Sequence, residues 1–129
     1  MPKEPNRRPT DAELSLLRAL WKRGPSTVRE VLEALGDPSI GYTTVLKLLQ
    51  IMASKGLVSR DESQRAHLYK AEISEDQTQR RLLGELVDKL FGGSPALLVQ
   101  KALSSERAST EEIEEIKRLV EEWKEEDQE

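Results

Sequence analysis

Cysteine is absent from this 129-residue chain, and histidine occurs only once, at position 67. Without cysteine the chain has no disulfide, no thiolate metal ligand and no cysteine nucleophile. His67 has no histidine partner at metal-ligand spacing, so we predict no metal site. The glycines fall at expected helix ends and form no phosphate-binding loop. We therefore expect no catalytic residues, no metal and no cofactor, which argues against a small enzyme.

Long apolar runs are missing as well. No stretch of about 18 apolar residues occurs, and the N-terminal residues lack the pattern of a signal peptide. We therefore expect a cytoplasmic protein without membrane insertion. The length suits one domain or two small ones.

Two short helices are expected near the N-terminus because their start and stop signals are clear. The first begins with a capping box, Thr10 with Glu13, and ends at a Gly-Pro pair at 24–25. The second begins at residue 26 or 27 and ends at Gly36. Their expected core positions are Leu14, Leu17, Leu20, Trp21, Val28, Val31, Leu32 and Leu35.

A third helix, starting at residue 42 or 43, has two contrasting faces. Its apolar residues recur at i, i+3, i+4 and i+7, which places them on one side; they are Val45, Leu48, Leu49 and Met52. The other side carries Thr43, Thr44, Lys47 and Gln50, whose side chains can hydrogen-bond both base edges and phosphates. Taken alone, the same pattern also fits an ordinary surface helix with a solvated polar side.

Two short strands follow the third helix and indicate a β-hairpin. Leu57 and Val58 begin the first strand, residues 61–64 form the turn, and Ala66 and Leu68 alternate with His67 and Tyr69 on the second. Arg60 and Arg65 flank the turn, where long basic side chains usually reach DNA phosphates. Three helices followed by a two-stranded ribbon predict a winged helix-turn-helix, with His67 also in the wing.

Charge divides the chain into two unlike parts. Residues 1–71 contain 12 Lys and Arg against 8 Asp and Glu, a net charge of +4. Residues 72–129 contain 8 against 16, a net charge of −8. A basic first part can follow phosphates while an acidic second part does not, which favours nucleic-acid binding. A generic acidic protein would also fit the overall charge of −4.

The second half of the chain has helices with strong apolar faces and no candidate catalytic residues. We expect a helix over 74–91 after a Ser74–Gln77 capping box, a short helix opened by Ser94 and Pro95, and a last helix opened by Ser109 and Glu112. The apolar positions that we expect to form a dimer interface are Leu82, Leu83, Leu86, Val87, Leu90, Phe91, Leu97, Leu98, Ile113, Ile116, Val120 and Trp123.

Fewer than about 70 residues rarely bury such faces well as a single copy. A two-fold dimer buries the same patch on both chains, so we predict a homodimer. The alternative is a helical hairpin that packs back onto the N-terminal part. The expected fold is mainly α with a small β-wing: a winged-helix DNA-binding domain over 1–72, then a helical dimerisation domain over 73–129. A helical adaptor or antirepressor that binds a protein without DNA remains an alternative.

Several motifs together resemble the penicillinase repressor (BlaI/MecI) family of bacterial transcription factors. They are PTDAELSLLRALWKRGPSTVREVLEAL, then GYTTVLKLLQIMASKGLVSR, RAHLY, and the FGGS break after the helix over 74–91. The resemblance runs from about Pro9 to Trp123. It implies a homodimeric repressor of promoters with a dyad of TACA/TGTA-like half-sites on double-stranded DNA. It also implies that the groove is read by the opening of the third helix, here Tyr42, Thr43, Thr44 and Lys47.

This sequence departs from the family pattern in places that bear on regulation. Antibiotic-responsive members are inactivated when a membrane-bound sensor metalloprotease triggers cleavage of an Asn-Phe bond after the FGGS-like break. The corresponding segment here is Val99-Gln100-Lys101-Ala102, so that bond is not carried over. The wing turn has Gln64 before Arg65 where members usually have glycine, and residues 50–52 lack an arginine that many members carry. Relief by an external signal, with a sensor protease as partner, is implied by the resemblance alone.

Overall fold

The computed structural model describes residues 8–127 and contains six helices and one two-stranded sheet over that range. The helices are α1 (Asp11–Arg23), α2 (Val28–Leu35), α3 (Tyr42–Ser54), α4 (Glu75–Leu90), α5 (Pro95–Leu103) and α6 (Thr110–Asp127). The strands are β1 (Val58–Asp61) and β2 (Leu68–Ala71), and they pair antiparallel with Val58 opposite Ala71. The contacts divide the chain after Gln79, within α4, into two compact units.

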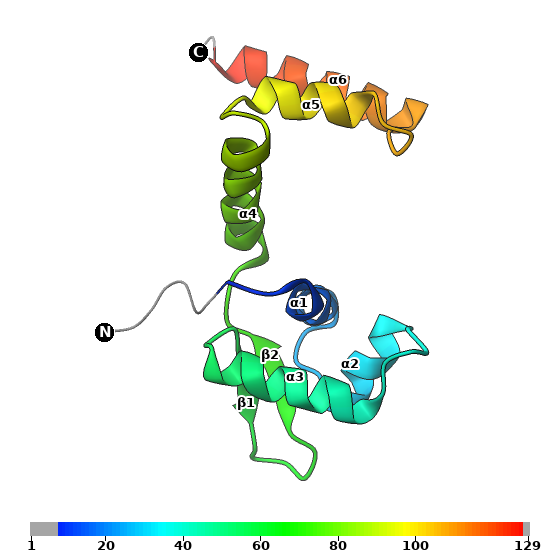
Figure 1. The fold of residues 1–129 in the computed structure, drawn as a ribbon, viewed down its shortest axis with the longest axis vertical. Coiled ribbons are helices and arrows are strands. Elements are labelled where there is room, and N and C mark those ends of the chain that lie inside the picture. The colour runs from blue at the N-terminus through cyan, green and yellow to red at the C-terminus, as the bar shows by residue number, and fades with distance from the viewer. Residues whose placement is uncertain (1–7, 128–129) are drawn as a thin grey trace, which may run out of the picture. The chain divides into compact units, whose positions relative to one another are not determined.

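The first unit, described from residue 8 to 79, is a three-helix core with a β-hairpin (Figure 1). Each of its three helices packs on the other two, and the hairpin lies against α1 and α3. The predicted fold class, a mainly α winged helix-turn-helix, is confirmed. The fully or nearly buried apolar side chains of this unit are Leu16, Leu17, Leu20, Val28, Val31, Val45, Leu49, Met52, Leu57, Val58 and Tyr69. Leu16 is a core residue that the predicted positions of the first helix omitted.

The predicted helix ends of this unit are confirmed. The Thr10 and Thr27 hydroxyls accept hydrogen bonds from the backbone N–H groups of Glu13 and Glu30, whose carboxylates accept the reciprocal bonds. These bonds satisfy donors that the first turn of a helix otherwise leaves free. Gly36 follows α2 with φ of 61°, a left-handed conformation that glycine adopts without steric cost.

The wing differs from its prediction in two details. The first strand begins at Val58, not Leu57, and the second begins at Leu68. Ala66 and His67 therefore lie in the turn, which is longer than predicted. The hairpin is also tied to the helices, because Ser26 and Tyr69 exchange two backbone hydrogen bonds of 2.9 and 2.8 Å. This bridge fixes β2 against the segment that leads into α2.

The second unit, residues 80–127, contains most of α4 together with α5 and α6. Ser94 accepts a hydrogen bond from the Leu97 N–H, with Pro95 in the first turn, as predicted. Ser109 accepts one from the Glu112 N–H, which opens α6. Gly92 and Gly93 have positive φ and end α4. Among the hydrophobic side chains of residues 80–127, only Val87 is buried, so this unit has almost no core of its own.

Candidate nucleic-acid interface

The two faces of α3 are exposed and buried as its sequence predicts. Val45, Leu49 and Met52 are fully buried in the core of the first unit. Thr43, Thr44, Lys47 and Gln50 are exposed on the other side. These three buried side chains hold α3 against the core, so the polar side chains on its other face have a well-defined position. Such a position is what reading a base edge requires, since each hydrogen bond depends on it.

The start of α3 is open. Gly41 precedes the helix, and no side chain caps its first N–H groups. The other five helices differ in this respect, because each has a side-chain hydroxyl that accepts a hydrogen bond from an N–H of its first turn. These hydroxyls belong to Thr10, Thr27, Ser74, Ser94 and Ser109. Uncapped N–H groups and the positive end of the helix dipole favour an anion at this end.

Arg65 and His67 are exposed in the wing turn. The turn is ordered at its start, where the Asp61 carboxylate accepts a hydrogen bond of 2.9 Å from the Ser63 N–H. This bond lowers the pKa of Asp61 from its usual value, so the carboxylate stays charged. The wing therefore presents basic side chains beside an acidic one.

Arg60, the other predicted wing residue, is already paired. Its guanidinium forms an ion pair with the Glu62 carboxylate, although both side chains remain partly exposed. Hydrogen bonding to the Tyr69 hydroxyl and the charge of Glu62 raise the pKa of Arg60 further. The positive charge of Arg60 is thus partly neutralised before any partner binds. The sequence places Glu62 nearby but does not show that it pairs with Arg60.

A groove of about 460 Å³ joins these elements. Its lining comes from the start of α2, the first half of α3 and the wing: Thr27, Val28, Arg29, Tyr42, Leu46, Arg65, Ala66, His67 and Tyr69. Arg29 is the basic residue of this groove that the sequence prediction missed. Its Cζ lies 5.5 Å from the centroid of the Tyr42 ring, a cation–π contact. The available signal was an arginine on the polar side of α2, next to the cap.

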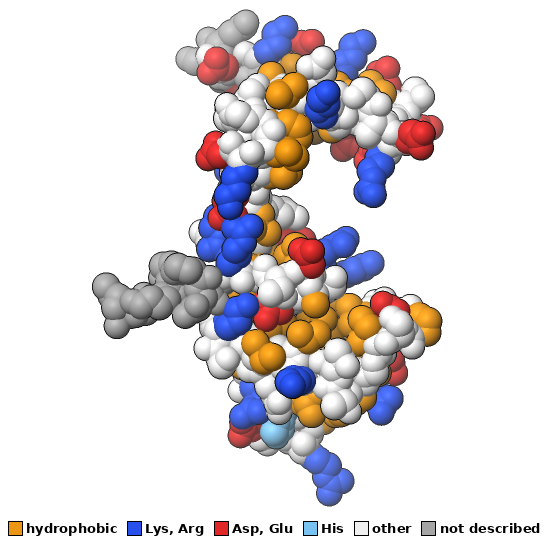
Figure 2. All heavy atoms as spheres, viewed as in Figure 1, with side chains coloured by type: hydrophobic (Ala, Val, Ile, Leu, Met, Phe, Trp, Pro, Cys, Tyr) orange, Lys and Arg blue, Asp and Glu red, His pale blue; other side chains and the backbone are white. Residues whose placement is uncertain are grey.

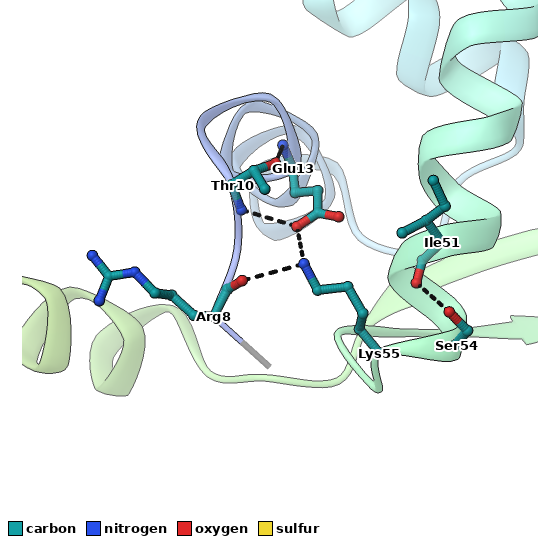
Figure 3. A network of polar contacts seen from close by, with 6 residues as sticks. All are labelled: Arg8, Thr10, Glu13, Ile51, Ser54 and Lys55. Carbon is teal, nitrogen blue, oxygen red and sulfur yellow. Dashed lines mark hydrogen bonds and ion pairs between the residues drawn. The ribbon is translucent and has the colours of Figure 1, made fainter. Parts of the chain in front are cut away.

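The far end of α3 is anchored by a polar network (Figure 3). The Lys55 ammonium donates to the Glu13 carboxylate at 2.6 Å and to the Arg8 carbonyl at 3.2 Å. Glu13 also accepts from the Thr10 N–H, and its side chain is only 3% exposed. Burial alone would raise the pKa of Glu13, but Lys55 and Thr10 together hold it below the usual value. The network ties the start of α1 to the end of α3.

The predicted dimerisation residues fall into two groups. Most are exposed or half-buried on α4, α5 and α6, with exposed fractions that reach 66% for Leu90 and 72% for Trp123. Val87 is buried within its own chain, so it supports α4 from inside. Leu119 and Val99 are exposed apolar residues that the prediction omitted. Hydrophobic side chains reach the surface in this unit (Figure 2), and those of α6 line an open groove of about 600 Å³.

Residues 8–127 contain neither a membrane-spanning helix nor a metal-binding cluster. None of the helices in this range combines the length and apolar character needed to cross a bilayer. In the same range, no group of three or more histidine, aspartate or glutamate side chains is placed to hold a metal ion.

The penicillinase repressor family matches this sequence over residues 9–122. The transcriptional regulator BlaI of Mycobacterium tuberculosis is 34% identical over 114 residues, which cover 85% of this chain and 80% of the regulator. The penicillinase repressor of Bacillus licheniformis is 25% identical over 116 residues, covering 89% of this chain and 91% of the repressor. The solution structure of monomeric Bacillus licheniformis BlaI with the blaP half-operator aligns with 52% of this chain and 83% of its own, at a TM-score of 0.45 and 25% identity.

Proposed function

Because this chain belongs to the penicillinase repressor family, we propose that it represses transcription by binding a double-stranded DNA operator as a homodimer. The observation that carries the proposal is the polar face of α3, exposed on a helix whose opposite face is fully buried. The family is one of transcriptional repressors, so we propose no enzymatic activity. A protein that acts on the promoter works in the cytoplasm, which is where we place it.

In this proposal α3 lies in the major groove, which is wide enough to admit a helix. Thr43, Thr44 and Gln50 offer neutral donors and acceptors for base edges, and Lys47 offers a charged donor. The wing contacts the phosphates with Arg65, and with Arg60 once it leaves Glu62. Phosphate contacts fix the orientation of the protein, while contacts to base edges supply sequence preference.

Residues 1–72 form the DNA-binding domain in this proposal, and residues 73–129 form the dimerisation domain. The near absence of a core between residues 80 and 127 supports the second part, because exposed leucines and a tryptophan need a partner to leave water. Two copies related by a two-fold axis would present two reading helices to a dyad operator.

Relief by an external signal, with a membrane-bound sensor protease as partner, belongs to the same proposal. The segment Val99-Gln100-Lys101-Ala102 lies inside α5, where the backbone is helical. Cleavage there would first require local unfolding of α5. The second unit has little buried apolar surface, and this favours such local opening.

The proposed reading face is tested with Thr44→Ala and Lys47→Ala. Both side chains are exposed, so each variant should fold, and each should weaken binding to the DNA upstream of its own gene by roughly 1–3 kcal/mol. Thr44→Ala should lose preference for this DNA over a random-sequence duplex. If Lys47 contacts a phosphate, its loss should weaken binding to both duplexes equally. Fluorescence anisotropy measures the affinities, and circular dichroism checks the fold.

Ser15→Ala is a suitable control, because Ser15 is an exposed hydroxyl on α1 and does not belong to the polar face of α3. Unchanged affinity in both α3 variants would place the reading surface elsewhere. A wild-type chain that binds neither duplex would instead favour a helical adaptor without DNA binding.

Removing the acidic partner of Arg60 is expected to strengthen DNA binding, in contrast to the two substitutions on α3. Glu62→Gln removes the carboxylate that neutralises Arg60, so DNA affinity should rise by about threefold to tenfold. The slope of log affinity against log salt concentration should steepen by up to about 0.9, the value for one additional phosphate contact. Glu72→Gln makes the same charge change at the residue that follows β2, at the end of the strand that is farther from the turn. It should have a smaller effect. Equal effects of the two substitutions would mean that each only reduces the repulsion between the protein and DNA, and that the pairing of Glu62 with Arg60 is not the cause.

A further inference from the structure

The groove between α2, α3 and the wing contains two arginines that lack an acidic partner. Within residues 8–127, Arg29 and Arg65 form no ion pair, whereas Arg23 pairs with Glu30 and Arg60 pairs with Glu62. Both arginines line the groove, and both are exposed. Their charges are therefore available to an anion that enters from solvent.

Arg29 is held in place by an aromatic ring. Its guanidinium carbon lies 5.5 Å from the centroid of Tyr42, the first residue of α3. A cation–π contact uses the positive charge of a guanidinium and leaves its N–H edge free to donate. It also limits the rotamers of a long side chain, so less entropy is lost when the N–H groups bind. A planar pair of N–H donors suits a phosphate.

The groove lies next to the open start of α3, the helix that we propose reads the bases. Its other lining groups are the Thr27 side chain, His67 and apolar or aromatic side chains, and no carboxylate is among them. The charge and the donors of this groove are therefore suited to a monoanionic phosphodiester at the edge of the major groove.

We propose that this groove seats one phosphate of the DNA backbone, with Arg29 and Arg65 as its donors, and that Tyr42 positions Arg29 and does not contact a base. The inference rests on the proposed function and assigns Tyr42 a different role from the one that its place in the reading helix suggests. It also connects the wing to α2 through one ligand, so both would fix the same stretch of backbone.

The test compares single and double variants of the full chain on two DNA probes, the duplex upstream of its own gene and a random-sequence duplex. Arg29→Ala should weaken binding to both probes by a similar factor, about threefold to tenfold, and should reduce the salt slope by about 0.9. Tyr42→Phe keeps the ring and should bind like the wild type. Tyr42→Leu should lose affinity in the wild-type background but lose nothing more in the Arg29→Ala background, because Tyr42 acts through Arg29.

Arg18→Ala is the matched control, since Arg18 is an exposed arginine on α1 outside this groove. It should change the salt slope much less than Arg29→Ala. Equal slopes for the two variants would overturn the phosphate seat, and a further loss for Tyr42→Leu in the Arg29→Ala background would overturn the positioning role. A wild-type chain that does not prefer the upstream duplex would instead refute the proposed function, so the two failures are distinct. Thermal melts confirm that each variant is folded.

Discussion

Leu90→Asp is expected to convert the proposed dimer into a monomer and to weaken operator binding by about 10²–10⁴-fold. Leu90 is 66% exposed in the single chain, so aspartate there costs the isolated fold little. In a dimer interface the same carboxylate would have to lose its water or become protonated, which is unfavourable by several kcal/mol. The affinity falls because two linked half-site contacts become one independent contact. Analytical ultracentrifugation and anisotropy on the upstream duplex measure both effects.

Gln100→Asp provides the control for charge, since Gln100 is an exposed polar residue of α5. This variant should remain a dimer with nearly unchanged affinity. Leu86→Asp, at a position that is 44% exposed, should behave like Leu90→Asp. If Leu90→Asp sediments as a dimer at micromolar concentration and binds the upstream duplex normally, the apolar face of α4 is not the interface.

Val87 shows why burial matters for the choice of variant. It is 9% exposed, whereas its neighbours Leu83, Leu86 and Leu90 on α4 are between 44% and 66% exposed. Aspartate at 87 would disrupt packing within one chain, so a monomer produced by that variant would say nothing about the interface. The sequence pattern of α4 does not distinguish these four residues. Only the structure shows that Val87 is buried and that the three leucines are exposed.

Local signals explain the parts of the fold that could be predicted from the sequence. A threonine followed three residues later by glutamate forms its reciprocal bonds within one turn, so the starts of α1 and α2 depend on little else. The same holds for Pro95 after Ser94 and for the glycines that end α4. The two faces of α3 follow from helical periodicity once a core exists on one side.

Contacts between distant residues could not be predicted in this way. The backbone bridge between Ser26 and Tyr69 has no periodic signature, because any residue with an N–H and a carbonyl could form it. The cation–π contact between Arg29 and Tyr42 depends on how α2 packs against α3. The start of β2 differs from its prediction because Ala66 and His67 continue the alternation of Leu68 and Tyr69 but do not pair with β1.

The ion pair between Glu13 and Lys55 joins residues 42 positions apart and was likewise invisible in the sequence. Glu13 is recognisable as a capping residue, but its burial and its second partner come from the packing of α1 against the end of α3. A buried carboxylate is costly without a compensating charge, so the fold depends on Lys55 more than its sequence context suggests.

Lys55→Met is therefore expected to lower the free energy of unfolding by about 3 kcal/mol at pH 7, because removing one partner leaves Glu13 buried without a counter-ion. Methionine retains much of the apolar length of lysine, so the loss reports mainly on the charge. Lys47→Met makes the same replacement at an exposed position of α3 and should change stability by less than about 0.5 kcal/mol. Urea unfolding followed by circular dichroism gives both values.

The pH dependence of the free energy of unfolding shows whether the charge of Glu13 causes the loss of stability in Lys55→Met. In the wild type the pKa of Glu13 lies below its ordinary value of 4.5, so its contribution to stability is complete above that pH and is lost as the pH falls through the folded pKa. In Lys55→Met the burial of Glu13 is no longer offset by an ammonium, so its pKa should rise and the carboxylate should take up a proton at a higher pH. The stability gap between wild type and Lys55→Met should therefore be widest near pH 7 and should narrow as the pH falls toward 4. A gap that stays constant from pH 7 to pH 4 would mean that Lys55 acts through its packing, and that the charge of Glu13 is balanced by Thr10 alone.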